Sequence, residues 1–158
     1  MTAYDYYLQR KSELYCYNRS DVKTLAGWVV TAPKELPESQ QAGFFEEVYR
    51  FMSDRYGEKN CIEAVVHLDE SSPHMHYCFI PVAPDAKHGG EKICCNEVIN
   101  PRELRNFHPD LQKWVTQAGY NVKVHSGVTR ERGGNRSVRE LKAEREERKR
   151  QYTRERRF

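Results

Sequence analysis

Three histidines and two carboxylates fall within ten consecutive residues, HLDESSPHMH, which run from His67 to His76. Short apolar runs rich in β-branched residues flank them, AVV before and YCFIPV after. This pattern favours two strands joined by a short turn over a helix. His74 and His76 are two residues apart, so both imidazoles project from the same face of a strand. The turn brings His67 back beside His74, and the hairpin therefore offers three nitrogen ligands on one surface.

Three neutral imidazoles on one surface predict a metal site with open positions for water or substrate. Such ligands suit Zn, Mn, Fe, Co or Ni, and geometry alone does not choose among these ions. Asp69 and Glu70 lie in the turn, where a carboxylate can orient a ligand's second N–H or hold a nucleophile or water beside the metal. Other histidines lack this setting and are expected at the surface: His88, His108 and His125.

Length and cysteine usage bound the class of protein. The 158 residues suffice for one domain with a sizeable core. No apolar run is long enough for a membrane span, and the first five residues lack the features of a signal peptide, so we expect a cytoplasmic protein. Five cysteines without a CxxC pair argue against a disulfide framework and a structural zinc knuckle, and favour reduced thiols.

The net charge of +3 is distributed unevenly along the chain. Residues 130–158 hold twelve Lys and Arg against six Asp and Glu, a local charge of +6. Residues 1–129 hold 14 basic and 17 acidic residues, a local charge of −3. A polyanionic partner is therefore expected at the C-terminal segment.

Apolar spacing predicts the elements that position the hairpin. We expect a helix over Glu38–Tyr56, because apolar residues recur there with helical spacing and Gly57 follows as a C-terminal cap. The other elements expected up to residue 96 are a poorly specified helix or arm over 1–26, a strand over 27–31, hairpin strands over 61–68 and 74–82, a turn region over 83–90 and a short strand over 92–96.

A second helix is predicted after Asn100, which serves as its cap with Pro101 in the first turn. Its apolar face extends to residue 118, and Pro109 is expected to kink or split it. A last strand is expected over 120–124. After Gly133-Gly134, the capping box of residues 137–140 predicts a long charged helix.

The expected order β-α-β-β-α-β is typical of an α+β fold with an antiparallel sheet and helices on one face, of ferredoxin-like type. We divide the chain into an N-terminal segment (1–26), a metal-binding core (27–128), and a basic linker with a charged helix (129–158).

The stretch HLDESSPHMH resembles the HxDExxPHxH motif of the Mob/Pre (MobV-type) plasmid mobilisation relaxases, within the HUH endonucleases. GWVVTAP, RYG and PREL in the flanks are also similar to this family. The resemblance implies a relaxase core that nicks and rejoins single-stranded plasmid or mobile-element DNA at a transfer origin, through a covalent 5′-phosphoryl intermediate.

The resemblance also implies roles for individual residues. His67, His74 and His76 would bind a divalent ion, with Mn or Mg expected in function and Zn, Co and Ni as alternatives. Glu70 would position the nucleophile, and Asp69 would support the metal ligands without binding the metal itself.

The nucleophile of the family is a histidine in an N-terminal segment before an Asn-Tyr motif, and here no histidine precedes His67. Residues 1–26 are interpreted as a truncated or divergent form of that segment. Tyr4, Tyr6 and Tyr7 could replace the nucleophile, but packing roles are favoured for them. A non-catalytic remnant that binds metal and DNA, and an unrelated His₃ metallohydrolase, are the alternative functions.

Four arginines beside Gly133-Gly134 are predicted to follow a phosphate backbone: Arg130, Arg132, Arg136 and Arg139. Beyond them, alternating Arg and Glu indicate a solvated helix, or one that contacts a partner or a second copy of the chain.

Overall fold

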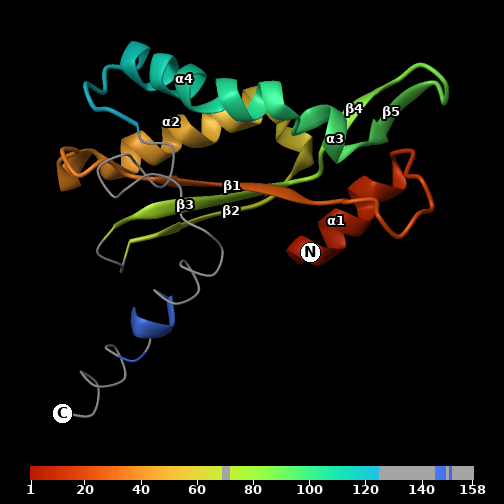
Figure 1. Ribbon diagram of the computed structural model, residues 1–158, viewed down its shortest axis with the longest axis horizontal. Coiled ribbons are helices and arrows are strands. Elements are labelled where there is room, and N and C mark those ends of the chain that lie inside the picture. The colour runs from red at the N-terminus through yellow and green to blue at the C-terminus, as the bar shows by residue number, and fades with distance from the viewer. Residues whose placement is uncertain (69–71, 125–144, 149, 151–158) are drawn as a thin grey trace. The chain divides into compact units, whose positions relative to one another are not determined.

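The computed structural model describes residues 1–68, 72–124, 145–148 and 150. The chain divides into two compact units, Met1–Val124 and His125–Phe158. In the first unit, helices α2 (Glu38–Tyr56) and α4 (Pro101–Gln117) cover one face of a three-stranded sheet (Figure 1). The predicted α+β class, with an antiparallel sheet and helices on one face, is confirmed.

The sheet consists of β1 (Ala26–Thr31), β2 (Cys61–His67) and β3 (His74–Phe79). Its order is β1-β3-β2, and both neighbours of β3 are antiparallel to it. The strand that carries two of the three histidines is therefore the central one, with its backbone paired on both sides. Among the described residues, β1 and β2 each pair on one side only.

Alternation along β3 separates a buried face from an open face. Met75, Tyr77 and Phe79 are at most 4% exposed and pack under α2 and α4. The helices supply the other half of this core: Phe44, Phe45, Val48, Phe51, Met52, Phe107, Leu111 and Val115. Each such side chain contributes about 1.5–3 kcal/mol when fully buried. This burial fixes the strand's register, because a slip by one residue would turn the histidines inward.

Polar contacts tie the two covering helices together. Arg55 on α2 forms an ion pair with Glu103 on α4 and donates to Asp110 at 3.0 Å. The Trp28 indole, on the core side of β1, donates to the Tyr56 hydroxyl at 2.7 Å. These contacts hold α4 at a fixed position over the sheet.

The N-terminal residues form a regular helix, α1 (Ala3–Ser12), more defined than the sequence suggested. Its capping box joins Thr2 and Asp5 through two hydrogen bonds. Arg10 is buried and donates to Asn60 at 2.9 Å in the short helix η1 (Glu58–Asn60). Helix α1 is therefore anchored next to the start of β2.

The region after β3 differs from the prediction. The turn region expected over 83–90 and the strand expected over 92–96 are instead a hairpin of β4 (Val82–Asp85) and β5 (Gly90–Ile93), followed by α3 (Cys95–Val98). Strand β3 ends at Phe79 rather than at residue 82. The hairpin forms because Ile80 and Ile93 are buried together in a second small core.

Helix α4 runs through Pro109 without splitting, contrary to one of the two expected outcomes. The predicted strand over 120–124 is wrong, because these residues adopt no strand. The Gln112 side chain donates to the Val122 carbonyl at 2.9 Å and accepts from the Val124 amide at 2.7 Å. A side chain of α4 therefore binds the backbone groups that a sheet would otherwise pair.

Within the described part of the chain, no helix is long and apolar enough to cross a membrane. In the second unit, residues 145–148 and 150 are helical, and the remainder of the long charged helix predicted after residue 137 lies outside the described residues. The division into residues 1–26, 27–128 and 129–158 stays a prediction.

Candidate metal centre

The ladder between β2 and β3 brings the three histidines together. His67 pairs directly with His74, and His76 follows two residues later on the same side of β3. Directly paired residues on neighbouring strands have Cβ atoms about 4.5–5.5 Å apart. The expectation of three imidazoles on one surface of a hairpin is therefore confirmed.

The imidazoles are close enough to serve a single ion. Ring centroids lie 5.1 Å apart for His67 and His74, 5.1 Å for His67 and His76, and 4.8 Å for His74 and His76. One nitrogen from each ring lies within 4.8 Å of the others. Two nitrogens that bind one ion at about 2.1 Å lie at most about 4.2 Å apart. Small side-chain rotations cover the difference, so the residues fit a divalent metal.

The turn that joins the two strands is anchored at its C-terminal side. The Ala32 amide, at the end of β1, donates to the Pro73 carbonyl at 2.8 Å. His74 Nδ1 lies 3.0 Å from the Ser72 carbonyl, which can only accept. Nδ1 therefore donates a proton in this contact, as the second nitrogen of a metal-binding histidine commonly does.

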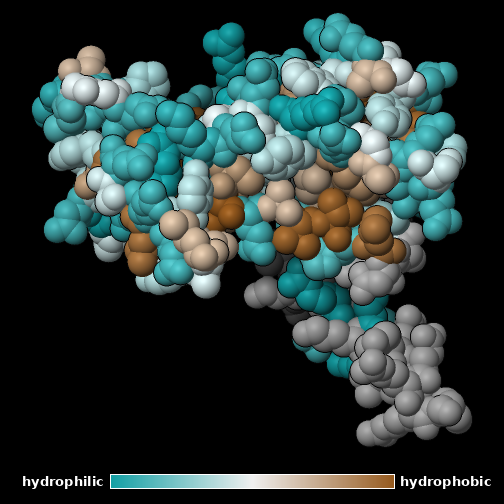
Figure 2. Space-filling model, turned by 180° about the vertical axis from the view of Figure 1, so that it is seen from behind, coloured by the Kyte–Doolittle hydropathy of each residue, from teal (hydrophilic) through white to brown (hydrophobic). Residues whose placement is uncertain are grey.

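The centre lies on the face of the sheet opposite α2 and α4, because His74 and His76 alternate with buried Met75 and Tyr77. Thr31, Val29 and Gly27 continue this face on β1, paired with His74, His76 and Cys78. Figure 2 shows that polar surface dominates the side seen from behind, with apolar side chains gathered in a few clusters. None of the three histidines is buried, so a substrate can reach them.

Two sets of predicted site residues lie outside the described residues. They are the turn carboxylates Asp69 and Glu70, and the arginines Arg130, Arg132, Arg136 and Arg139. Their roles stay predictions.

Two of the three candidate tyrosine nucleophiles, Tyr6 and Tyr7, are at the wrong end of β2. The Tyr6 hydroxyl donates to the Lys59 carbonyl at 2.6 Å, and the Tyr7 hydroxyl bonds with Thr24 Oγ1 at 2.7 Å. Both therefore lie near Cys61, where β2 begins, whereas His67 is its last residue. Six residues of strand span roughly 20 Å. The favoured interpretation of these tyrosines as packing residues agrees with this placement.

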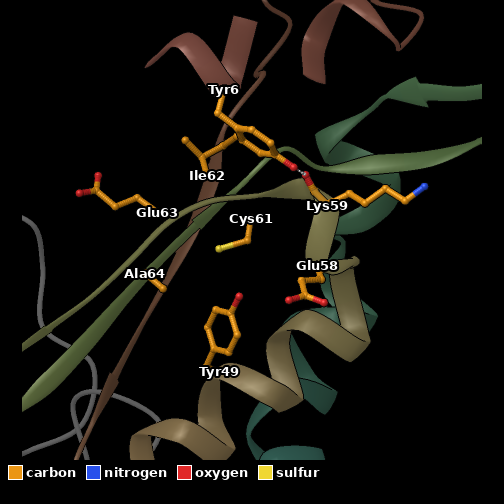
Figure 3. A pocket seen from close by; sticks show the side chains of 8 residues that line it. All are labelled: Tyr6, Tyr49, Glu58, Lys59, Cys61, Ile62, Glu63 and Ala64. Carbon is orange, nitrogen blue, oxygen red and sulfur yellow. Dashed lines mark hydrogen bonds between the residues drawn. The ribbon is translucent and has the colours of Figure 1, made fainter. Parts of the chain in front are cut away.

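A hollow of about 550 Å³ lies at this same end of the strand (Figure 3). Tyr6 from α1 and Tyr49 from α2 flank the backbone of β2 there. Burial raises the pKa of the Cys61 thiol, so it stays protonated at neutral pH. The hollow holds no histidine and is separate from the metal centre.

Of the histidines expected at the surface, His88 is exposed as predicted, whereas His108 is not. His108 is half-buried against the rings of Trp28 and Phe107, and burial lowers its pKa. His88 stacks on Tyr15 and lies 2.6 Å from Asp85. Sequence spacing did not reveal the contacts with Trp28 and Tyr15, because both lie far from these histidines in the chain. Sequence spacing also missed Thr31, Val29 and Val65, which only the strand pairing brings beside the ligands.

Comparison with known proteins assigns the family and the fold. Residues 5–150 match the family model for plasmid recombination enzymes, Mob_Pre. A plasmid recombination enzyme of Lactiplantibacillus plantarum is 31% identical over 133 residues, which cover 82% of this chain and 35% of that protein. A plasmid recombination enzyme type 3 of Mammaliicoccus lentus is 34% identical over 101 residues, 64% of this chain and 22% of that protein.

Solved structures of the MobM relaxase domain bound to oriT DNA of plasmid pMV158 are also similar. A manganese-bound complex with a 22-nucleotide strand aligns with a TM-score of 0.68 and 26% identity, over 89% of this chain and 71% of that one. A complex with 26 nucleotides aligns with a TM-score of 0.63 and 26% identity, over 84% of this chain and 76% of that one. The chain spans about a third or less of the length of the curated relatives described above.

Proposed function

The chain belongs to the Mob/Pre family of plasmid recombination enzymes, and from this premise we propose that it forms the metal-binding core of a relaxase that nicks and rejoins single-stranded plasmid DNA at a transfer origin. The observation that carries the proposal is the convergence of His67, His74 and His76 on the open face of the sheet. A bacterial cytoplasm, where plasmids reside, is the proposed location.

The three imidazoles would hold one divalent ion on a face that a DNA strand can reach. A bound ion polarises the scissile phosphate and offsets the negative charge that develops during cleavage. The protein's own contribution is positional. Strand β3 is paired on both sides, so the directions of His74 and His76 are set before the substrate arrives.

Manganese or magnesium is the proposed ion in function. Support comes from the two solved MobM complexes described above. Both are bound to oriT DNA, and the complex with 22 nucleotides is also bound to manganese. Imidazole ligands alone bind Zn, Co or Ni as well. Titration with each ion in parallel would rank them.

Glu70 is proposed to position the nucleophile beside the ion. Asp69 is proposed to support a metal ligand without binding the ion itself. The motif supports this assignment, because both carboxylates belong to the turn between the two ligand strands. A Glu70→Gln variant should keep its affinity for manganese and lose DNA cleavage.

One observation favours a second candidate function, that of a core which binds metal and DNA without cleaving. Tyr6 and Tyr7 are engaged at the far end of β2, and no histidine precedes His67. Neither tyrosine therefore lies beside the metal centre, where a replacement nucleophile would have to lie.

Incubation of the chain with Mn²⁺ and a single-stranded origin oligonucleotide distinguishes these functions. A protein–DNA adduct that survives denaturing electrophoresis is the expected result for a complete relaxase. Metal-dependent DNA binding without an adduct would indicate the non-cleaving core. Turnover of a small phosphate ester without an adduct would indicate a metallohydrolase and overturn the proposal.

A further inference from the structure

Two apolar side chains stand on either side of one metal ligand. Val29 on β1 and Val65 on β2 both pair directly with His76 on β3. The three side chains therefore form one row across the open face of the sheet. Val29 is 51% exposed and Val65 is 36% exposed.

The exposure of these two valines is connected with the metal centre. Single exposed apolar residues are common on protein surfaces and need no explanation. These two, however, flank the same ligand, in the row next to the paired His67 and His74. Covering them with a protein helix would also cover the ligands. A substrate that uses the centre is therefore the natural source of their burial.

The geometry restricts which part of a DNA strand can reach them. Neighbouring strands lie about 4.8 Å apart, so each valine is about one side-chain width from His76. A phosphate held at the imidazoles would place the adjoining deoxyribose, and the base attached to it, within reach of these valines. These groups present apolar faces, which a branched side chain can cover without reading the base sequence.

We propose that Val29 and Val65 form an apolar shelf that packs against the deoxyribose and base next to the metal-bound phosphate and so orients the strand. The inference rests on the proposed function and deepens it, since it assigns two positioning residues for the DNA. Thymine, with its methyl group, is the base that such a shelf would cover best.

The test is a binding cycle between protein variants and DNA strands that lack single bases. Val29→Thr and Val65→Thr keep the branched shape suited to a strand and replace one methyl by a hydroxyl. The probe is the 22-nucleotide pMV158 oriT strand bound by the structural relative, together with versions of it that carry one abasic position each. Affinities are measured by fluorescence anisotropy with Mn²⁺, and the affinity for Mn²⁺ by calorimetry.

Each variant should bind the intact strand about fourfold more weakly, the effect of uncovering one methyl group. On a strand abasic at the contacted position the difference between variant and unaltered protein should shrink, because only the contact with the deoxyribose remains. Both variants should bind Mn²⁺ normally. Leu104→Ala is the matched control, an apolar truncation at a 54% exposed residue of α4 on the other side of the sheet, and should change neither affinity.

Two results would overturn the shelf. If the valine variants bind the intact strand as tightly as the unaltered protein, the shelf does not contact DNA. If they lose affinity equally on every abasic strand, their effect is indirect. If the unaltered chain binds neither this strand nor a thymidine 25-mer in the presence of Mn²⁺, the proposed function itself is rejected.

Discussion

The hydrogen bond between His74 Nδ1 and the Ser72 carbonyl orients the imidazole, and this has a consequence for metal affinity. A neutral imidazole whose proton is held on one nitrogen presents the other nitrogen as a ready ligand. His67 and His76 differ in their neighbours, and the pairing of His76 with two valines makes its surroundings the more apolar. At this scale the centre is a set of ligands with fixed directions.

Replacing His74 and His76 by Ala should abolish manganese binding, because one imidazole alone remains. Stability should change little, since both side chains point away from the core. Calorimetric titration and urea unfolding measure the two effects. His88→Ala is the control and should bind manganese normally. Unchanged manganese affinity in the double variant would show that the ion binds elsewhere.

His108 should make folding stability depend on pH. Burial lowers its pKa from the ordinary value of 6.5, so the unfolded chain binds a proton more readily than the folded chain. The stabilising effect is therefore complete above about pH 6.5 and is lost as the pH falls through the lowered pKa. The decline in unfolding free energy from pH 7.5 to 5 should be smaller in His108→Gln. Equal declines would show that His108 titrates normally in the folded state.

At the scale of elements, the central position of β3 is what turns a sequence motif into a site. The strand is buried on one face under α2 and α4 and paired along both edges. It can neither slip nor twist without exposing Tyr77 and Phe79. The end of the first unit is held differently, by Gln112 on α4 rather than by the sheet.

Gln112→Ala should destabilise the first unit by about 1–3 kcal/mol, because two hydrogen bonds to the backbone, of about 0.5–1.5 kcal/mol each, are lost together with an exposed one to Thr116. Urea unfolding provides the measurement. Gln112→Glu keeps the acceptor for the Val124 amide and loses the donor to the Val122 carbonyl. The stability of this variant should therefore lie between that of the unaltered protein and that of Gln112→Ala. A Gln112→Ala protein as stable as the unaltered one would mean that residues 120–124 do not depend on this side chain.

At the scale of the whole molecule, the excess of positive charge and the candidate metal centre belong to different units. The metal ligands belong to Met1–Val124, and the excess of basic residues belongs to the C-terminal unit. Affinity for DNA is therefore expected to have two sources, one dependent on the ion and one dependent on salt.

Replacing Arg130, Arg132, Arg136 and Arg139 by Ala should lower the salt dependence of DNA binding. Each lost contact with a single-strand phosphate reduces the slope of log affinity against log salt by about 0.7. Four contacts thus correspond to a reduction of about 3, measured by anisotropy at several salt concentrations. Arg145→Ala with Arg148→Ala is the control, from the segment predicted to be solvated. An equal reduction there would indicate a general charge effect.

The sequence by itself determined the ligand set, the antiparallel α+β class and the bounds of helix Glu38–Tyr56. Local periodicity encodes these features, because alternation in a strand and apolar spacing in a helix depend on neighbouring residues only. Tertiary structure decided which residues stand beside the ligands, how far Tyr6 and Tyr7 lie from them, and that residues 120–124 bind Gln112 instead of forming a strand. Those outcomes depend on contacts between segments far apart in the chain, where several pairings compete and packing selects one.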